Sequence, residues 1–159
     1  MKIIKKETLI NAFLAAIGGF LCIGFLSYLN MTFDASVWLI PPFGASMVLV
    51  MSVHKSPLAQ PKNLMFGHVL SALSGVLVYA LLGQSFYSLG TGVALAIFVM
   101  MITNTVHPPA GANPIIAILG GESLSFVLLP VAIGALIIII FAIIYNKILG
   151  RNYPIRTNN

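Results

Sequence analysis

Acidic residues are almost absent from this sequence: its 159 residues include three Asp and Glu in total, and only 7% of all residues are charged. Hydrophobic residues make up 59% of the chain, and the mean hydropathy is +1.04. A soluble fold of this composition would leave too little polar surface to face water. The composition therefore predicts an integral membrane protein, with the lipid bilayer as a partner, in a single transmembrane domain over residues 1–159.

Cysteine, histidine and clustered acids are also scarce, which excludes several kinds of site. Cys22 is the only cysteine, so no internal disulfide can form. The three His, the Cys and the three acids form no helical pair four residues apart, so we expect no metal site and no cofactor. No base and orienting acid stand near the serines in sequence, so we predict that the chain is not an enzyme.

The basic residues are few but strongly grouped. Eight Lys and Arg give the chain a pI of about 9.6, a value that suggests nucleic acid as one partner class. They stand, however, in short clusters beside apolar runs, which is typical of signals that orient a membrane protein. We therefore expect no nucleic acid partner.

Apolar runs are what the sequence has in abundance, and six of them are predicted to be membrane-embedded helices. Their ranges are 8–30, 34–53, 63–83, 89–106, 107–121 and 124–146. Most approach the ~20 residues that cross a hydrocarbon core, and the last is expected to be continuous. The first run follows three lysines, but it is too long for a secretory signal and is expected to be retained. The fold class predicted is thus an all-α membrane protein.

Six crossings place both termini and all eight basic residues on one side of the membrane. Lys55 and Lys62 fall on that side, whereas Asp34 and Glu122 fall on the other. The positive-inside rule then puts both termini in the cytoplasm, and we expect a multi-pass protein of a cell (inner) membrane. If either run that contains a Pro-Pro pair, 34–53 or 107–121, were a re-entrant loop and not a crossing, some clusters of basic residues would lie outside the cell. The positive-inside rule disfavours that alternative.

A short pattern occurs twice, as PPFGAS from Pro41 and as PPAGAN from Pro108, with the second copy starting 67 residues after the first. A Pro-Pro pair lacks helical N–H donors and breaks the entry to a span, while the following Gly and Ala permit close approach. The halves 8–83 and 89–146 each contain three crossings, an odd number. They are therefore predicted to form an inverted repeat, with the second and fifth segments broken at Pro-Pro. The alternative is two proline kinks that only shape helix packing.

The starts of the two broken helices form the predicted binding site. Their first N–H groups have no intrahelical partner and carry the positive end of the helix dipole, which suits a small inorganic anion. No charged side chain lies inside a span, so the anion would depend on backbone N–H groups and small polar side chains, and binding should be weak. The predicted site residues are Pro42, Phe43, Gly44, Ala45, Ser46, His107, Pro108, Pro109, Ala110, Gly111, Ala112 and Asn113.

Two histidines are the candidates for a proton route through the spans. His107 stands beside the second break and could donate a hydrogen bond or carry a proton. His68, in the third predicted span, is either a proton or polar relay or a residue that hydrogen-bonds within a Gly/Ser-rich helix interface. The nearby Ser71, Ser74 and Gly75 are predicted to form a close-packed helix face.

Residues 105–113, TVHPPAGAN, resemble the signature of the His-Pro-Pro (HPP) family of integral membrane proteins. Residues 42–46, 56–63 and 67–68 resemble its other recurrent stretch, and the resemblance extends from about Gly18 to Tyr145. Family members in plastids and cyanobacteria are associated with nitrite transport, so the resemblance implies nitrite as the anion. The sequence thus predicts an anion transporter or channel, which we expect to be a homo-oligomer. A non-transporting assembly or regulatory subunit is the alternative.

Overall fold

The computed structural model describes residues 5–33 and 38–155, and this part of the chain contains helices and turns but no strand. The longer helices are α1 (Lys6–Thr32), α3 (Pro61–Leu82), α4 (Phe86–Ile102) and α7 (Ile133–Ile148). The shorter ones are α2 (Pro41–Ser52), α5 (Asn113–Gly120) and the single turn α6 (Leu124–Phe126). Two 3-10 turns, η1 (Pro57–Ala59) and η2 (Pro108–Ala112), precede α3 and α5, and a π-helical stretch, η3 (Val127–Ala132), joins α6 to α7. The all-α class is confirmed for these residues.

Prolines begin several of these helices. Pro41, Pro61 and Pro108 occupy the first position of α2, α3 and η2, where a missing N–H costs no intrahelical hydrogen bond. Gly83 and Gly121 follow the ends of α3 and α5 with φ of 64° and 63°, values that glycine adopts most readily. Each Pro-Pro pair therefore stands at the start of a helical segment.

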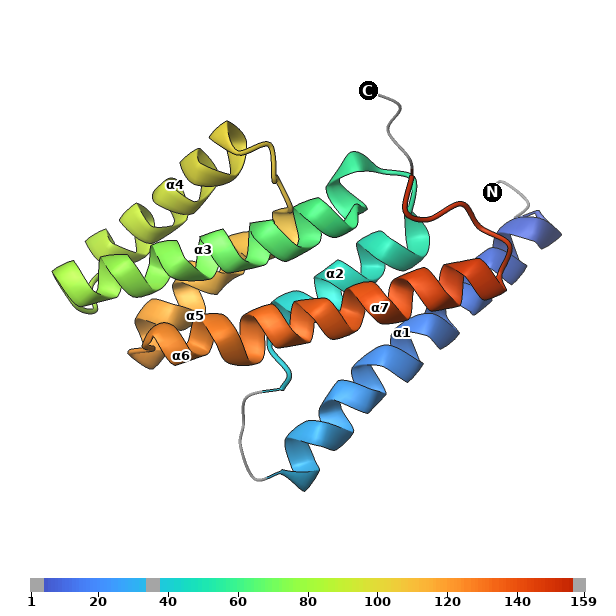
Figure 1. The fold of residues 1–159 in the computed structure, drawn as a ribbon, viewed down its shortest axis with the longest axis horizontal. Coiled ribbons are helices and arrows are strands. Elements are labelled where there is room, and N and C mark those ends of the chain that lie inside the picture. The colour runs from blue at the N-terminus through green and yellow to red at the C-terminus, as the bar shows by residue number, and fades with distance from the viewer. Residues whose placement is uncertain (1–4, 34–37, 156–159) are drawn as a thin grey trace.

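Helix α3 lies at the centre of the bundle (Figure 1). Helices α4 and α5 both pack against it and against each other, η3 and α7 run along it, and α1 packs outside against α2 and α7. Within the described part of the chain, three helical stretches are long and apolar enough to cross a membrane: Lys6–Thr32, Pro61–Leu82 and Leu124–Ile148. Segments α2 and α4 are shorter apolar helices.

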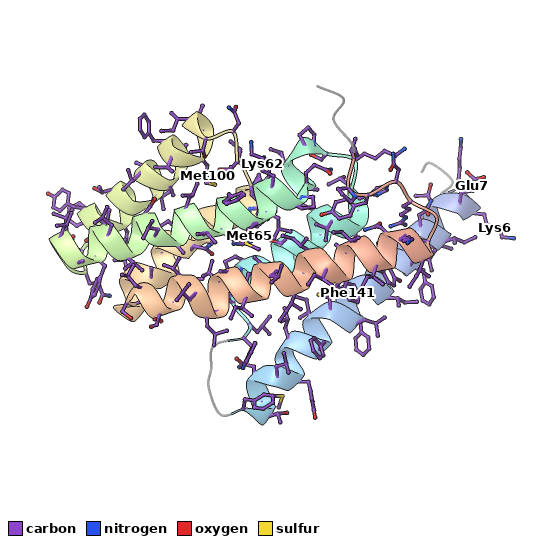
Figure 2. All side chains as sticks on the ribbon, viewed as in Figure 1. Lys6, Glu7, Lys62, Met65, Met100 and Phe141 are labelled. Atoms are coloured by element: carbon purple, nitrogen blue, oxygen red, sulfur yellow. The ribbon has the colours of Figure 1, made fainter. Side chains whose placement is uncertain are left out.

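The outside of the bundle is apolar. Large hydrophobic side chains project from several helices (Figure 2), and Phe20, Leu81 and Ile148 are 76%, 73% and 75% exposed. Inside, Phe43 and Leu64 are fully buried. Since water would not tolerate so many exposed apolar groups on a monomer, this exterior suits contact with lipid.

The residues after α7 fold back onto the loop between α2 and α3. The Tyr153 hydroxyl donates to the Ala59 carbonyl at 2.8 Å, and the Ile155 N–H donates to Gln60 Oε1 at 2.9 Å. Burial raises the pKa of the Tyr153 phenol, so the hydroxyl keeps its proton and remains a donor. The start of α1, the loop 53–60 and the C-terminal segment therefore share one end of the bundle (Figure 1).

Basic side chains from distant parts of the sequence gather at this end. Arg151 donates to the Met51 carbonyl at 3.1 Å and to Asn11 Oδ1 at 3.4 Å, which brings α1, α2 and the C-terminal segment together. Burial, followed by the positive charges of Arg151 and Lys55, lowers the pKa of His54, so this imidazole is neutral near pH 7. Glu122 follows α5 at the opposite end. Of the charged residues in the orientation argument, Lys2, Asp34 and Arg156 lie outside the described residues.

The last apolar segment differs from the continuous run expected over 124–146. The backbone is extended at Leu129, with φ −134° and ψ 118°, and regular α-helix resumes only at Ile133. Pro130 explains the interruption, since it lacks an N–H and disfavours helical backbone in the residue before it. The expectation of continuity was therefore wrong at this proline.

Candidate functional site

Four polar side chains from four segments meet in the interior of the bundle. Ser46 comes from α2, His68 from α3, His107 from the residue before η2, and Asn113 from the start of α5. Each is fully buried. Helix starts bring two of them there, because Asn113 is the first residue of α5 and His107 immediately precedes the second Pro-Pro pair. Ser46 lies in the middle of α2. We call these four residues the central network.

Short hydrogen bonds join the members of the central network in a line. Ser46 Oγ lies 2.8 Å from Nε2 of His68 and 2.8 Å from Nε2 of His107. His107 Nδ1 lies 2.7 Å from the Leu58 carbonyl, and His68 Nδ1 lies 3.0 Å from Asn113 Nδ2. The line therefore runs from Asn113 through the two imidazoles to a backbone carbonyl in η1.

One set of neutral tautomers satisfies every bond in this line. The Leu58 carbonyl can only accept, so His107 carries its proton on Nδ1 and its Nε2 accepts from the Ser46 hydroxyl. Ser46 Oγ then accepts from the Nε2–H of His68. The remaining nitrogen of His68, Nδ1, accepts from the Asn113 amide. These assignments follow from the partners and fix the direction of each hydrogen bond.

The orientation of the Asn113 side-chain amide is also fixed by its partners. Its Nδ2 lies 3.0 Å from the His68 carbonyl oxygen, which can only accept, so the amide nitrogen must be the atom on this side. The other amide atom, Oδ1, is buried without a hydrogen-bond partner among the described residues. An unpaired buried acceptor is costly, so Asn113 leaves one position where a donor from a ligand or water would be stabilised.

Close backbone contacts hold the segments around the central network. Gly67 faces His107 and the Thr105 carbonyl so closely that an added Cβ would lie 2.6 Å and 2.9 Å from them. Ser71 donates to the Ala110 carbonyl at 2.6 Å, and an added Cβ on Gly75 would lie 2.5 Å from Pro114 Cα. The close-packed face predicted for this part of α3 is therefore confirmed at Ser71 and Gly75.

The other predicted site residues surround the central network without joining it. Phe43 packs its ring edge-on to His68, with centroids 5.4 Å apart, and the Pro42 carbonyl lies 3.2 Å from Ser46 Oγ. Pro109 and Ala110 are buried, whereas Ala45 and Pro108 border a surface hollow of about 440 Å³ and Ala112 is half-buried. Side chains added at Gly44 or Gly111 would meet no atom within 4 Å. Both glycines thus face open space.

Two members of the site were not foreseen from the sequence. The Leu58 carbonyl sets the tautomer of His107, and Gly67 makes room for the His107 backbone and side chain. A backbone carbonyl has no signature in residue type. Its one signal was the position of Leu58 within residues 56–63, one of the stretches that resemble a recurrent family motif.

Comparison with known proteins gives a family match over nearly the whole chain. The family profile described as "HPP, transmembrane region" matches residues 4–154. Two transmembrane proteins of Dictyostelium discoideum are similar, one 37% identical over 152 residues and the other 33% identical over 153 residues. The alignments cover 89% and 91% of this chain but 53% and 49% of those proteins, so the chain spans about half their length. No solved structure matches.

Proposed function

This chain belongs to the HPP family of transmembrane proteins, and we propose that it is a transporter or channel for a small monovalent anion, with nitrite as the candidate. The central network is the observation that carries the proposal. Fully buried polar side chains inside a bundle with an apolar exterior usually mark a pathway for a polar solute. Nitrite itself rests on the resemblance of residues 105–113 to the family signature.

The anion would bind between the start of α2 and the start of η2 and α5, where the positive ends of the helix dipoles favour negative charge. The first N–H groups there, those of Phe43 and Ala110, already donate to the carbonyls of Ile40 and His107. Ser46 and Asn113 lie within this region and both imidazoles contact it. Their polar atoms already bond to one another, so an entering anion must replace some of these bonds. That exchange supports weak binding and a rearrangement of the network in each transport cycle.

We also propose that residues 8–83 and 89–146 form an inverted repeat of six membrane-embedded segments. Packing across the halves supports it. Gly75 of α3 contacts Pro114 of α5, and Gly134 of α7 contacts the Phe43 ring of α2. The third long segment of each half thus packs against the short helix of the other half, as two interlocked copies of one unit would.

The proposed orientation has both termini in the cytoplasm of a cell with an inner membrane. Lys55→Cys should therefore resist an impermeant thiol reagent applied outside cells, whereas Glu122→Cys should react, because the two positions lie at opposite ends of the bundle. Background labelling should be low, since Cys22 is only 1% exposed. Labelling of Lys55→Cys and protection of Glu122→Cys in intact cells would reverse the orientation.

Nitrite uptake into proteoliposomes tests the proposed activity. Gly44→Val and Gly111→Val should lower uptake about tenfold or more while the protein stays folded, because a Cβ added at either glycine meets no atom within 4 Å and the side chain takes up space near the helix starts. Gly90→Val is the matched control, since this exposed α4 position is equally open but distant in sequence from both starts. Equal uptake by all three variants would place the anion elsewhere.

The alternative function, a non-transporting assembly or regulatory subunit, predicts no protein-dependent uptake in the same vesicles. A homo-oligomer is part of the proposal for either function. Cross-linking in membranes followed by mass measurement would reveal the number of chains in the assembly.

A further inference from the structure

The Ser46 hydroxyl has two acceptors within reach. It lies 2.8 Å from His107 Nε2 and 3.2 Å from the carbonyl oxygen of Pro42, one turn earlier in α2. In the neutral network the hydroxyl donates to His107. Rotation about its C–O bond would direct the same hydrogen to Pro42 instead, with no movement of a heavier atom.

This second orientation lets the central network accept one proton. A proton on Nε2 of His107 would donate to Ser46 Oγ, which already accepts from the Nε2–H of His68 and has two lone pairs. The Ser46 hydroxyl then donates to Pro42, and the Nδ1–H of His107 keeps its bond to Leu58. Every hydrogen bond of the imidazoles is retained after the proton arrives.

His68 is not equivalent to His107 as a proton acceptor. Its free lone pair is on Nδ1, where the Asn113 amide donates at 3.0 Å, so a proton there would face another N–H. The amide cannot turn to relieve this contact without losing its bond to the His68 carbonyl. A second proton is also disfavoured, because the two imidazole centroids are only 5.0 Å apart. The geometry selects one proton, on His107.

A protonated His107 would have no counter-charge among the described residues that surround it. Among the described residues, α2, η2 and α5 carry no Asp, Glu, Lys or Arg, α3 carries Lys62 in its first turn, and the loop 53–60 adds His54 and Lys55. His68 is the one titratable side chain within this set that contacts His107. A buried cation without a partner is costly, so the proton is favoured when an anion arrives with it.

We propose that His107 Nε2 takes up one proton together with each anion, so that the chain moves the anion of a weak acid and a proton as a neutral pair. This inference rests on the proposed transport function. The proton comes from water on one side, occupies His107 while the anion is bound, and returns to water on the other side. The N–H bond forms as an O–H bond of a hydronium ion on the first side breaks, and on the other side the N–H bond breaks as water takes the proton.

The test records nitrite uptake and internal pH in the same proteoliposomes, with protein-free vesicles to subtract leakage of the neutral acid. We expect one proton to enter with each nitrite, at a rate unaffected by a voltage set with potassium and valinomycin. Voltage-dependent nitrite uptake without acidification would overturn the proton inference and leave anion transport intact. No protein-dependent nitrite uptake would overturn both.

His107→Gln tests the residue, because glutamine retains an N–H donor but cannot take a proton. The number of protons that enter with each nitrite should fall from one to zero. An unchanged number would contradict the assignment of the proton to His107. Nitrogen NMR of the wild-type chain in detergent gives a readout that does not depend on transport. Added nitrite should convert His107 to imidazolium and leave His68 neutral, whereas protonation of His68 alone, or of neither, would overturn the inference.

Discussion

Ser46→Ala is expected to destabilise the protein by roughly 2–6 kcal/mol, because it leaves two buried polar groups unpaired, and to abolish nitrite uptake. Ser46 is the one hydroxyl that joins the two imidazoles, accepting from His68 and donating to His107, each at 2.8 Å. Its removal leaves the Nε2–H of His68 and the Nε2 lone pair of His107 unpaired at fully buried positions. Each unsatisfied buried group costs about 1–3 kcal/mol.

Ser74→Ala is the matched control for this prediction. Ser74 lies on α3 and is 5% exposed, but its hydroxyl donates at 2.8 Å to the Leu70 carbonyl of its own helix, so no imidazole loses a partner when it is removed. Reversible unfolding in mixed detergent micelles gives the free energy of unfolding of Ser46→Ala and of Ser74→Ala. Equal stabilities of the two variants would show that the Ser46 hydroxyl does not join the imidazoles in the folded protein.

Three residues of the central network were predictable from the sequence because they belong to the repeated pattern or stand directly before it. Ser46 and Asn113 hold equivalent places after the two Pro-Pro pairs, and His107 precedes the second pair. For His68 the sequence left two roles open: a proton or polar relay, or a residue that hydrogen-bonds within a helix interface. The structure gives it hydrogen bonds to Ser46 and Asn113, which both interpretations allow, so its role stays a prediction.

The closeness of packing was harder to predict, because it depends on which helix lies opposite each glycine. The sequence singled out Gly44 and Gly111 by their motif, yet an added Cβ there meets nothing. At Gly67 and Gly134, outside the motif, it would meet His107 and the Phe43 ring. Local pattern identifies small residues, but only tertiary structure says which of them a second helix approaches.

The direction of hydrogen bonding was equally hidden from the sequence. It is set by the Leu58 carbonyl, and that carbonyl is held by the turn η1. The neighbouring Ala59 carbonyl accepts from Tyr153, a residue 94 positions later in the chain. A sequence pattern cannot show that a C-terminal tyrosine secures the loop that orients a histidine near the centre of the bundle.

Gly75→Ala is expected to destabilise the protein by about 1–3 kcal/mol, as overpacking of a well-packed interior typically does. The added Cβ would lie 2.5 Å from Pro114 Cα, 3.1 Å from the Pro114 carbonyl oxygen and 3.0 Å from Ala117 Cβ. Two of these atoms belong to the α5 backbone, so no side-chain rotation can relieve the contact. Helix α5 must therefore move away from α3.

This movement should reach the central network, because Asn113 is the first residue of α5 and both of its hydrogen bonds go to His68 on α3. Gly90→Ala provides the control in α4, where the added Cβ meets nothing and helix propensity favours alanine by up to about 1 kcal/mol. The free energy of unfolding in mixed micelles should thus be higher for Gly90→Ala than for wild type and lower for Gly75→Ala. The nitrogen resonances of His68 should shift in Gly75→Ala alone. A stable Gly75→Ala protein with unchanged His68 signals would mean that α3 and α5 do not meet at Gly75.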